Sequence, residues 1–365
     1  MRILRVTQKA YPDVKGGAAY HTHAMSRDQA EMGHDVTLLT VRQDDSLPHV
    51  EERDGYTVVR FDSLCSPLGN DISPGLAQYL QEANEFDVIH AHSHLYFATN
   101  LAALKRQLGD TLLAITNHGL FSQNAPKWVF DLYLRSVGRW TFNQADLLFC
   151  YTDEDKKRVQ EYGVSSRIEV VSNGIDTERF SPRGPESELV GKGDPVVLFV
   201  GRLVEGKQPS VAVEAMAGVL EAYPEGILYF CGEGPLRDEL QELAEGLGIR
   251  DHVRLLGQVP YEEMPAVYRA ADVLVLPSRA EGTPRTVMEA LSSDVPVVNS
   301  DLSQVRSAFG EHVAYFDCGD VASLAEKIRL TFETVQEPHL KSRFNWKSTV
   351  EETTTVLEEI VREER

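Results

Sequence analysis

Two cations stand five residues apart on a loop that directly follows an apolar stretch. Arg202 and Lys207 come after Val196–Val200, a run that is typical of a buried strand. Open parallel sheets bind ligands at the carboxyl ends of their strands, and a guanidinium beside an ammonium suits a diphosphate there. The alternative is a pair of solvated surface charges. Lysine is scarce, with 11 residues against 25 arginines, which favours a functional role for Lys207.

Two carboxylates follow a later apolar stretch, residues 273–278. Glu281 stands in the loop and Glu289 eight positions further on, a little over two turns if a helix begins near Thr283. Backbone N–H groups at such a helix start could face an anion, while Glu289 would point at neutral hydroxyls such as those of a ribose. The alternative is a capped helix with one solvated glutamate.

Glycines and a histidine follow two earlier apolar stretches. Gly16 and Gly17 open a helical pattern, and a glycine turn of this kind lets a phosphate approach the positive end of a helix. A plain turn between a strand and a helix is the alternative. His118 stands beside Gly119 after Leu112–Thr116, where an imidazole could contact a sugar hydroxyl or help hold developing charge. A purely structural histidine is the alternative.

Three alternating histidines, His90, His92 and His94, suggest a metal site at first sight. They lack the carboxylate or cysteine partner that such a site needs, so the sequence predicts no metal centre. The four cysteines are scattered along the chain without a CxxC pair, which is typical of reduced thiols.

The length and charge of the chain restrict its class. With 365 residues it is long enough for two α/β domains of similar size. A formal net charge of -20 argues against a nucleic acid partner, because neutralising phosphates needs clustered lysines and arginines. The acidic excess together with the scarcity of lysine favours adaptation to high salt, where screening offsets self-repulsion.

No apolar run approaches the roughly 20 residues that a membrane-spanning helix needs. The first six residues pass directly into a strand pattern instead of the apolar core of a signal peptide. We therefore expect a cytoplasmic protein.

Short apolar runs alternate with helical patterns over nearly the whole length, which predicts parallel βαβ units and an α/β fold. The first series of expected strands is 1–7, 35–41, 58–61, 88–91, 112–116 and 147–151, and the second is 196–200, 227–231, 253–256, 273–277, 295–299 and 314–316. A segment rich in proline, glycine and charge, Asp176–Pro195, separates the two series and predicts a linker with its hinge at Pro182–Pro185.

The predicted domains are therefore residues 1–180 and residues 181–345. An amphipathic helix is expected over about 346–365. A second amphipathic stretch, Lys127–Trp140, combines aromatic residues with clustered cations. It suits docking at a lipid surface or holding a phospholipid-linked acceptor. An ordinary amphipathic core helix is the alternative.

The ordered set of motifs resembles the GT-B glycosyltransferases of family 4 over nearly the whole chain. The motifs, in chain order, are Gly16-Gly17, 33–36, 88–92, His118-Gly119, 172–176, Gly201-Arg202-Leu203 with Lys207, 231–235, 256–259, and Pro277-Ser278 leading into the Glu-x7-Glu segment. The resemblance implies two Rossmann-like doubly wound domains, a cleft between them, and a C-terminal helix that returns to the first domain.

The resemblance also implies that residues 1–180 bind the acceptor and that residues 181–345 carry the donor site. Arg202 and Lys207 would clamp the diphosphate, and Glu281 would hold the transferred sugar. Glu289 would take the ribose hydroxyls. The remaining contacts it implies are Gln258 and Val259 along the base, backbone groups of Thr283, Pro284 and Arg285 on the distal phosphate or sugar, Gly16 and Gly17 closing on the phosphates, and His118 over the sugar.

The activity that the resemblance implies is transfer of a hexose, with retention of configuration, from a UDP- or GDP-linked donor to a glycan or a polyprenyl or other lipid-linked acceptor. Family members do this without a settled catalytic nucleophile, so stabilisation of the leaving diphosphate is the main task, and no divalent ion or other cofactor is expected. A nucleotide-sugar epimerase on the same fold and a non-catalytic nucleotide-sugar-binding protein are the alternatives.

The chain departs from the family pattern at three places. Gln208 follows Lys207 where many relatives carry glycine, residues 301–306 replace a Gly-Gly turn, and Thr283-Pro284 replaces the commoner Phe-Gly. The last of these leaves the identity of the transferred sugar open.

Overall fold

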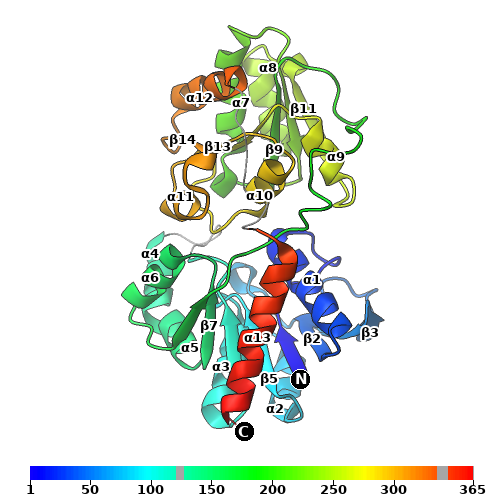
Figure 1. Ribbon diagram of the computed structural model, residues 1–365, viewed down its shortest axis with the longest axis vertical. Helices are drawn as coiled ribbons and strands as arrows, with labels where there is room; N and C mark the ends of the chain where they lie inside the picture. The colour runs from blue at the N-terminus through cyan, green and yellow to red at the C-terminus, as the bar shows by residue number, and fades with distance from the viewer. Residues whose placement is uncertain (121–126, 335–343, 365) are drawn as a thin grey trace. The chain divides into compact units, whose positions relative to one another are not determined.

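A computed structural model describes residues 1–120, 127–334 and 344–364. The chain forms two compact units (Figure 1). Unit 1 comprises Met1–Ser172 and Lys347–Arg365, and unit 2 comprises Asn173–Trp346.

Unit 1 is built on an eight-stranded sheet with the order β3-β4-β2-β1-β5-β6-β7-β8, in which only β3 runs antiparallel to its neighbour. Its strands are β1 (Arg2–Val6), β2 (Asp35–Val41), β3 (Val50–Arg53), β4 (Tyr56–Phe61), β5 (Val88–His92), β6 (Leu112–Thr116), β7 (Leu147–Cys150) and β8 (Arg167–Val170). Its helices are α1 (Gly17–Glu31), α2 (Pro74–Glu82), α3 (Phe97–Leu108), α4 (Lys127–Tyr133), α5 (Arg139–Asn143), α6 (Asp153–Glu161) and most of α13 (Trp346–Glu364).

Alternate residues of these strands supply two separate cores, because successive side chains of a strand point to opposite faces. Leu4 and Val6 of β1 pack with α2 and α3, whereas Ile3 packs on the other face with Leu357 and Ile360 of α13. The C-terminal helix therefore returns to the first unit, as the family resemblance predicts, and lies across its sheet (Figure 1).

Unit 2 has a fully parallel six-stranded sheet with the order β11-β10-β9-β12-β13-β14. Its strands are β9 (Val196–Val200), β10 (Ile227–Cys231), β11 (Val253–Gly257), β12 (Val273–Leu276), β13 (Val297–Ser300) and β14 (Ala314–Phe316). Its helices are α7 (Pro209–Leu220), α8 (Arg237–Gly246), α9 (Met264–Arg269), α10 (Arg285–Ser292), α11 (Ser303–Phe309) and α12 (Val321–Glu333). Helices α7, α8 and α12 cover one face and α9, α10 and α11 the other, so both units are doubly wound.

Each sheet has one point where the strand order reverses. In unit 1 this switch point lies between β1 and β5, and in unit 2 between β9 and β12. The crevice outside the carboxyl ends of the strands at such a point is where open α/β sheets bind ligands. The predicted diphosphate loop follows β9 and the predicted carboxylate loop follows β12, so the fold places both at the switch point of unit 2.

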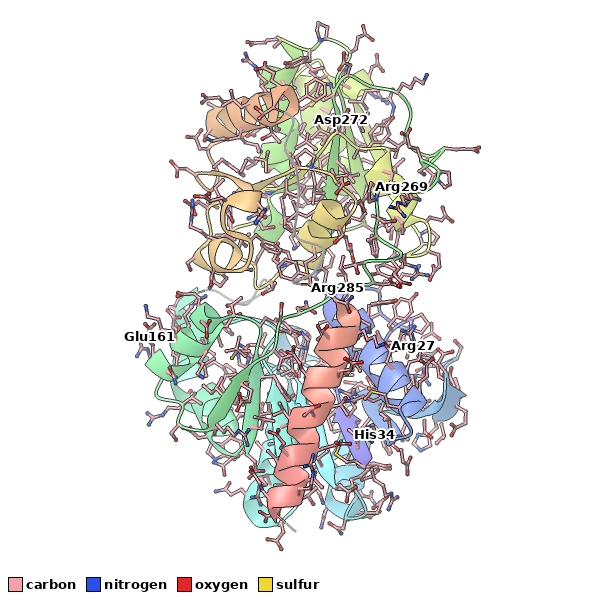
Figure 2. The ribbon with its side chains drawn as sticks, in the orientation of Figure 1. Arg27, His34, Glu161, Arg269, Asp272 and Arg285 are labelled. Atoms are coloured by element: carbon pink, nitrogen blue, oxygen red, sulfur yellow. The ribbon has the colours of Figure 1, made fainter. Side chains whose placement is uncertain are left out.

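The chain passes from unit 1 to unit 2 between residues 172 and 173, eight residues before the boundary that the sequence predicts at 180/181. It returns to unit 1 between residues 346 and 347. Residues 173–180 belong to unit 2 because Phe180 is fully buried in its core and Ile175 pairs with Phe344. The predicted hinge at Pro182–Pro185 is likewise inside unit 2, where Arg269 of α9 donates to the carbonyls of Ser181 and Pro185 (Figure 2).

The sequence missed the two edge strands of unit 1. β3 and β8 carry two or three charged residues each and are half exposed, so they lack the apolar run that marks the central strands. Among the helices that the structure describes, none combines the length and the apolar character that a bilayer span requires.

Candidate active site

An ion pair joins the loops after β9 and β12 at the switch point of unit 2. Lys207 ends a short 3-10 turn, Glu205–Lys207, and its Nζ contacts Oε1 of Glu281. The two side chains are only 15% and 6% exposed. The backbone N–H of Arg279 also donates to the carbonyl of Gly206, at 2.9 Å, which fixes one loop against the other. The predicted phosphate cation and the predicted sugar carboxylate are therefore brought together.

Two glycines allow the loop after β10 to approach the loop after β9. A Cβ added at Gly232 would overlap the carbonyl oxygen of Gly201, and one at Gly234 would overlap that of Leu203. Backbone bonds join the same loops, from Gly201 to Cys231 at 3.0 Å and from Leu203 to Glu233 at 2.9 Å. These glycines hold the backbone that carries Arg202.

Gln208 stands where many relatives carry glycine, and its backbone explains that preference. Its φ is 47°, in the left-handed region that glycine adopts without steric cost. The side chain faces the carbonyl of Pro277 and Nε of Arg279 when its amide is oriented to satisfy both. The side chain of Gln208 thus joins the loop of Lys207 to the loop after β12.

Glu289 lies deep in unit 2 on α10. Its carboxylate accepts hydrogen bonds from the hydroxyls of Tyr268 at 2.9 Å and Tyr261 at 3.2 Å, and it is 4% exposed. Burial raises its pKa, against the opposing effect of the nearby Arg285 guanidinium and the two tyrosine hydroxyls. Glu281 and Glu289 thus differ in surroundings: one faces an ammonium and the other two phenols.

Helix α10 begins at Arg285, with Pro284 as the residue that precedes its first turn. Pro284 carries no backbone N–H, so the predicted donors at this helix start reduce to Thr283 and Arg285. The hydroxyl of Thr283 is buried without a hydrogen-bond partner among the described residues, as is that of Ser278 in the same loop. Buried polar atoms without a hydrogen-bond partner, at the carboxyl ends of the strands, are suited to contacts with a ligand.

The side chain of Arg285, labelled in Figure 2, contacts other residues of unit 2. It donates to the carbonyl of Gly174 at 2.8 Å and to the hydroxyl of Tyr261 at 3.1 Å, and it lies over the ring of Trp346. Its guanidinium therefore supports the network around Glu289.

Arg202 and Gln258 are exposed, and Val259 is half-buried against the core of α9 and α10. They follow β9 and β11 at the same edge of the sheet as Lys207, because all strands of unit 2 run parallel. The backbone bond from Gly232 to Gly257, at 2.8 Å, joins the loops after β10 and β11.

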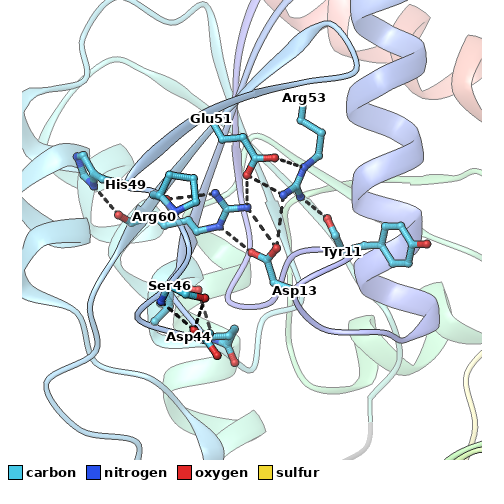
Figure 3. Close-up of polar contacts among 11 residues, drawn as sticks. Tyr11, Asp13, Asp44, Ser46, His49, Glu51, Arg53 and Arg60 are labelled. Atoms are coloured by element: carbon cyan, nitrogen blue, oxygen red, sulfur yellow. Dashed lines mark hydrogen bonds and ion pairs between the residues drawn. The ribbon is translucent and has the colours of Figure 1, made fainter.

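In unit 1, Gly17 is the first residue of α1 and Gly16 caps the helix with extended backbone. A Cβ at Gly16 would meet nothing within 4 Å among the described residues, so packing within the chain does not require glycine there. The preceding loop is fixed by Asp13, whose buried carboxylate pairs with Arg60 of β4 at 2.7 Å and with Arg53 of β3 at 3.5 Å (Figure 3).

His118 follows β6 and has a partner at each ring nitrogen. Its Nε2 lies 3.0 Å from Nδ1 of His92, and its Nδ1 lies 2.9 Å from the hydroxyl of Tyr151. Burial lowers the pKa of His118 to about 4, so the ring is neutral at pH 7. Of the three alternating histidines, His90 and His92 face Arg5, whereas His94 packs among Phe130, Tyr133 and Phe142.

Two family models match the chain almost end to end. Residues 15–179 match Glycosyltransferase Family 4, and residues 182–347 match Glycosyl transferases group 1. The chain is 31% identical, over 327 residues, to a D-inositol 3-phosphate glycosyltransferase of Nocardia farcinica, which covers 80% of this chain and 71% of that relative. The chain belongs to the GT-B glycosyltransferases of family 4.

Further comparisons agree with this membership. A GDP-mannose-dependent phosphatidylinositol monomannoside mannosyltransferase of Mycolicibacterium smegmatis is 26% identical over 303 residues, 79% of this chain and 78% of that relative. The solved structure of Anabaena Alr3699/HepE in complex with UDP-glucose superposes with a TM-score of 0.80 at 20% identity, over 98% of this chain and 100% of that one. The protein is a glycosyltransferase that uses a nucleotide-sugar donor.

Sequence reasoning missed the residues that support Glu289 in unit 2 and the histidines His90 and His92 in unit 1. Tyr261 and Tyr268 bind Glu289, and Arg5 binds His90 and His92. The GT-B resemblance carries no motif at Tyr261 or Tyr268. The charge of Arg5 inside an apolar strand was the one signal that could have marked it.

Proposed function

We propose that this enzyme moves a hexose, with retention of configuration, from a UDP- or GDP-linked donor to a glycan or lipid-linked acceptor. The observation that carries the proposal is the contact of Lys207 with Glu281 at the switch point of unit 2. A donor diphosphate would compete for the ammonium, and the sugar hydroxyls would then take the carboxylate.

The chemistry required of the protein is mainly electrostatic. The bond from the anomeric carbon to the diphosphate breaks as negative charge gathers on the leaving phosphate, and fixed cations lower the energy of that state. Arg202 and Lys207 would supply this charge, with the N–H groups of Thr283 and Arg285 at the start of α10. Gly16 and Gly17 would meet the phosphates from unit 1, and His118 would contact the sugar.

A panel of UDP-, GDP- and ADP-hexoses in a thermal-shift titration tests the donor site. One or two of them should raise the unfolding temperature of the wild type, and Lys207→Ala should need at least ten times more ligand for the same shift. Lys192→Ala removes an exposed lysine before β9, at the opposite edge of the sheet, and should behave as wild type. Equal shifts in both variants would contradict the assignment.

We further propose that no divalent ion is needed, since two cations of the chain replace it. Donor turnover should be unchanged in excess chelator. Activity that is lost on chelation and restored by magnesium would overturn this part of the proposal.

A lipid-linked acceptor is favoured by the segment from α4 to α5. Its inner side chains Phe130 and Leu134 are buried in the core of unit 1, but Trp128 and Leu132 are 71% and 62% exposed. The exposed Arg135 stands beside them, a combination that suits the interface of an anionic membrane. The mannosyltransferase relative is named for a phosphatidylinositol-linked acceptor.

Flotation with anionic vesicles tests this contact. The wild type should float at physiological ionic strength, and the double variant Trp128→Ser, Leu132→Ser should not. Leu108→Ser changes another exposed leucine of unit 1, 79% exposed, and should float as the wild type does. If the wild type and the Leu108→Ser control both fail to float, the membrane proposal is contradicted.

A further inference from the structure

A buried arginine in the core of unit 1 has no carboxylate partner among the residues that the structure describes. Arg5 of β1 is 0% exposed, and its guanidinium contacts Nδ1 of His90 at 3.0 Å, Nε2 of His92 at 2.9 Å and the side-chain oxygen of Gln29. Within residues 1–120, 127–334 and 344–364, none of its contacts is an ion pair. Burying a cation among neutral groups is costly, which favours a functional reason for it.

The register of the sheet builds this cluster. Arg5 shares the face of Ile3, and it is the direct partner of His90 where β1 pairs with β5 at the switch point. His90 and His92 point to the same face because they are two residues apart on one strand. Gln29 of α1 covers the guanidinium, and its amide donates to Oγ1 of Thr354 on α13 at 2.9 Å.

The contacts of Arg5 determine where the protons of the histidines lie. A guanidinium has only N–H donors, so Nδ1 of His90 and Nε2 of His92 must both accept. Burial lowers the pKa of both rings well below the usual range, so each is neutral and carries its one proton on the other nitrogen. His90 therefore donates from Nε2 to Oγ1 of Thr116, at 2.8 Å.

The same reasoning extends to the candidate active site. His92 carries its proton on Nδ1 and donates it to Nε2 of His118, at 3.0 Å. Nε2 of His118 is consequently an acceptor, and the proton of that ring sits on Nδ1, facing the Tyr151 oxygen at 2.9 Å. A chain of directed hydrogen bonds thus runs from Arg5 through His92 and His118 to Tyr151.

We propose that Arg5 is a positioning residue that fixes His118 as a neutral ring with its proton on Nδ1 and its Nε2 already engaged. In this state His118 does not accept the proton of the attacking hydroxyl. It contributes a ring of fixed orientation instead. The role in transfer rests on the proposed placement of His118 at the sugar, whereas the proton arrangement is a property of the unliganded protein.

The proton positions can be read directly. In a long-range proton–nitrogen correlation spectrum of enzyme labelled with 15N-histidine at pH 7, His90 should be protonated on Nε2, and His92 and His118 on Nδ1. Single His→Gln variants supply the assignments. A wild-type His118 that carries its proton on Nε2, or that is doubly protonated, would overturn the proposal without any need for a variant.

Two substitutions test the cause. Arg5→Met removes every donor, so the signals of His92 and His118 should change to a mixture of the two tautomers, while those of His94 should stay. Arg5→Lys keeps a cation and should preserve the pattern in part, which covers the case in which the methionine variant does not fold. Thr354→Val changes the far end of the network and should leave the pattern intact; a lost pattern there, or unchanged spectra in Arg5→Met, would contradict a specific role for Arg5.

Kinetics separate this proposal from the proposed function. With a donor that the wild type cleaves, Arg5→Met should lower kcat at least tenfold and Arg5→Lys should lower it by less. Both should leave KM for the donor within about twofold, since the proposed donor cations belong to unit 2. An unchanged kcat would refute the positioning role. If the spectra show the predicted tautomers but the enzyme cleaves no donor, the proposed transferase function is refuted and the proposed proton arrangement is confirmed.

Discussion

The two carboxylates of the Glu-x7-Glu motif have different surroundings, although they form one motif in the sequence. Glu281 faces the ammonium of Lys207, whereas Glu289 accepts from two phenols, one in the loop after β11 and one on α9. A carboxylate beside the cation that is proposed to bind phosphate is suited to the transferred sugar. One fixed by tyrosines is suited to shaping the pocket of the nucleotide.

Substitution of each carboxylate should therefore have a different kinetic effect. Glu289→Ala should weaken nucleotide binding about tenfold or more, because Tyr261 and Tyr268 lose the acceptor that orders them. Glu281→Ala should mainly lower kcat and leave nucleotide binding within about threefold. Calorimetric titration with the nucleoside diphosphate, combined with steady-state rates, measures both effects, and equal, negligible changes would disprove the division of roles.

His94 should make the stability of unit 1 depend on pH. Burial lowers its pKa to about 3, and both ring nitrogens lack partners among the described residues. The unfolded chain takes up this proton near pH 6.5 and the folded chain does not, so the free energy of unfolding falls as pH falls below about 6.5. At pH 5 this one group accounts for about 2 kcal/mol.

The variant His94→Phe should consequently lose about 2 kcal/mol less stability than the wild type between pH 7 and pH 5. Phe142→Leu changes the packing around the same ring without removing its titration, so its pH dependence should match the wild type. Urea unfolding at the two pH values makes the comparison. Parallel pH profiles for wild type and His94→Phe would argue against a buried neutral ring.

At the scale of elements, the loop between β1 and α1 is held by the hairpin of β3 and β4. Arg60 is 0% exposed, and its guanidinium binds Asp13 of that loop and Glu51 of β3, both through contacts within 3.2 Å (Figure 3). Arg53 adds a bond to the carbonyl of Tyr11, at 2.6 Å. The antiparallel edge strand thus fixes the loop that leads to Gly16 and Gly17.

Asp13→Ala should cost about 3 kcal/mol of unfolding free energy, because it leaves a buried guanidinium with one carboxylate partner instead of two. Asp62→Ala removes one partner of a more exposed pair, Arg42 with Asp62 at 3.2 Å, and should cost less than about 1 kcal/mol. Chemical denaturation compares the two variants. Similar losses would mean that the network does not hold the loop.

At the scale of the whole molecule, the net charge of -20 predicts a dependence on salt. Screening shortens the reach of surface repulsion from about 30 Å at 0.01 M salt to about 3 Å at 1 M. The thermal midpoint should therefore rise from dilute buffer to molar potassium chloride, and an equal osmolarity of an uncharged solute serves as the control. Full stability in dilute buffer would remove the case for adaptation to high salt.

The sequence predicted the alternation of strands and helices well because the central strands are mostly apolar runs between turn residues. It also predicted which loops carry Lys207 and Glu281, since both follow such runs. It could not predict that Arg5 meets His90 and His92, because the pairing of β1 with β5 is set by the order of the sheet. The edge strands β3 and β8 were not predicted, because their polar residues face water and the strands therefore show no apolar pattern.

The most direct test of the account is release of nucleoside diphosphate from the donor selected by thermal shift, measured with and without a crude lipid acceptor. The wild type should release it faster with acceptor, and Lys207→Ala and Glu281→Ala should each reduce the rate at least a hundredfold, about 2.7 kcal/mol of barrier. Conversion of the donor sugar without any release of diphosphate, or full release by both variants, would contradict a transferase built on these two residues.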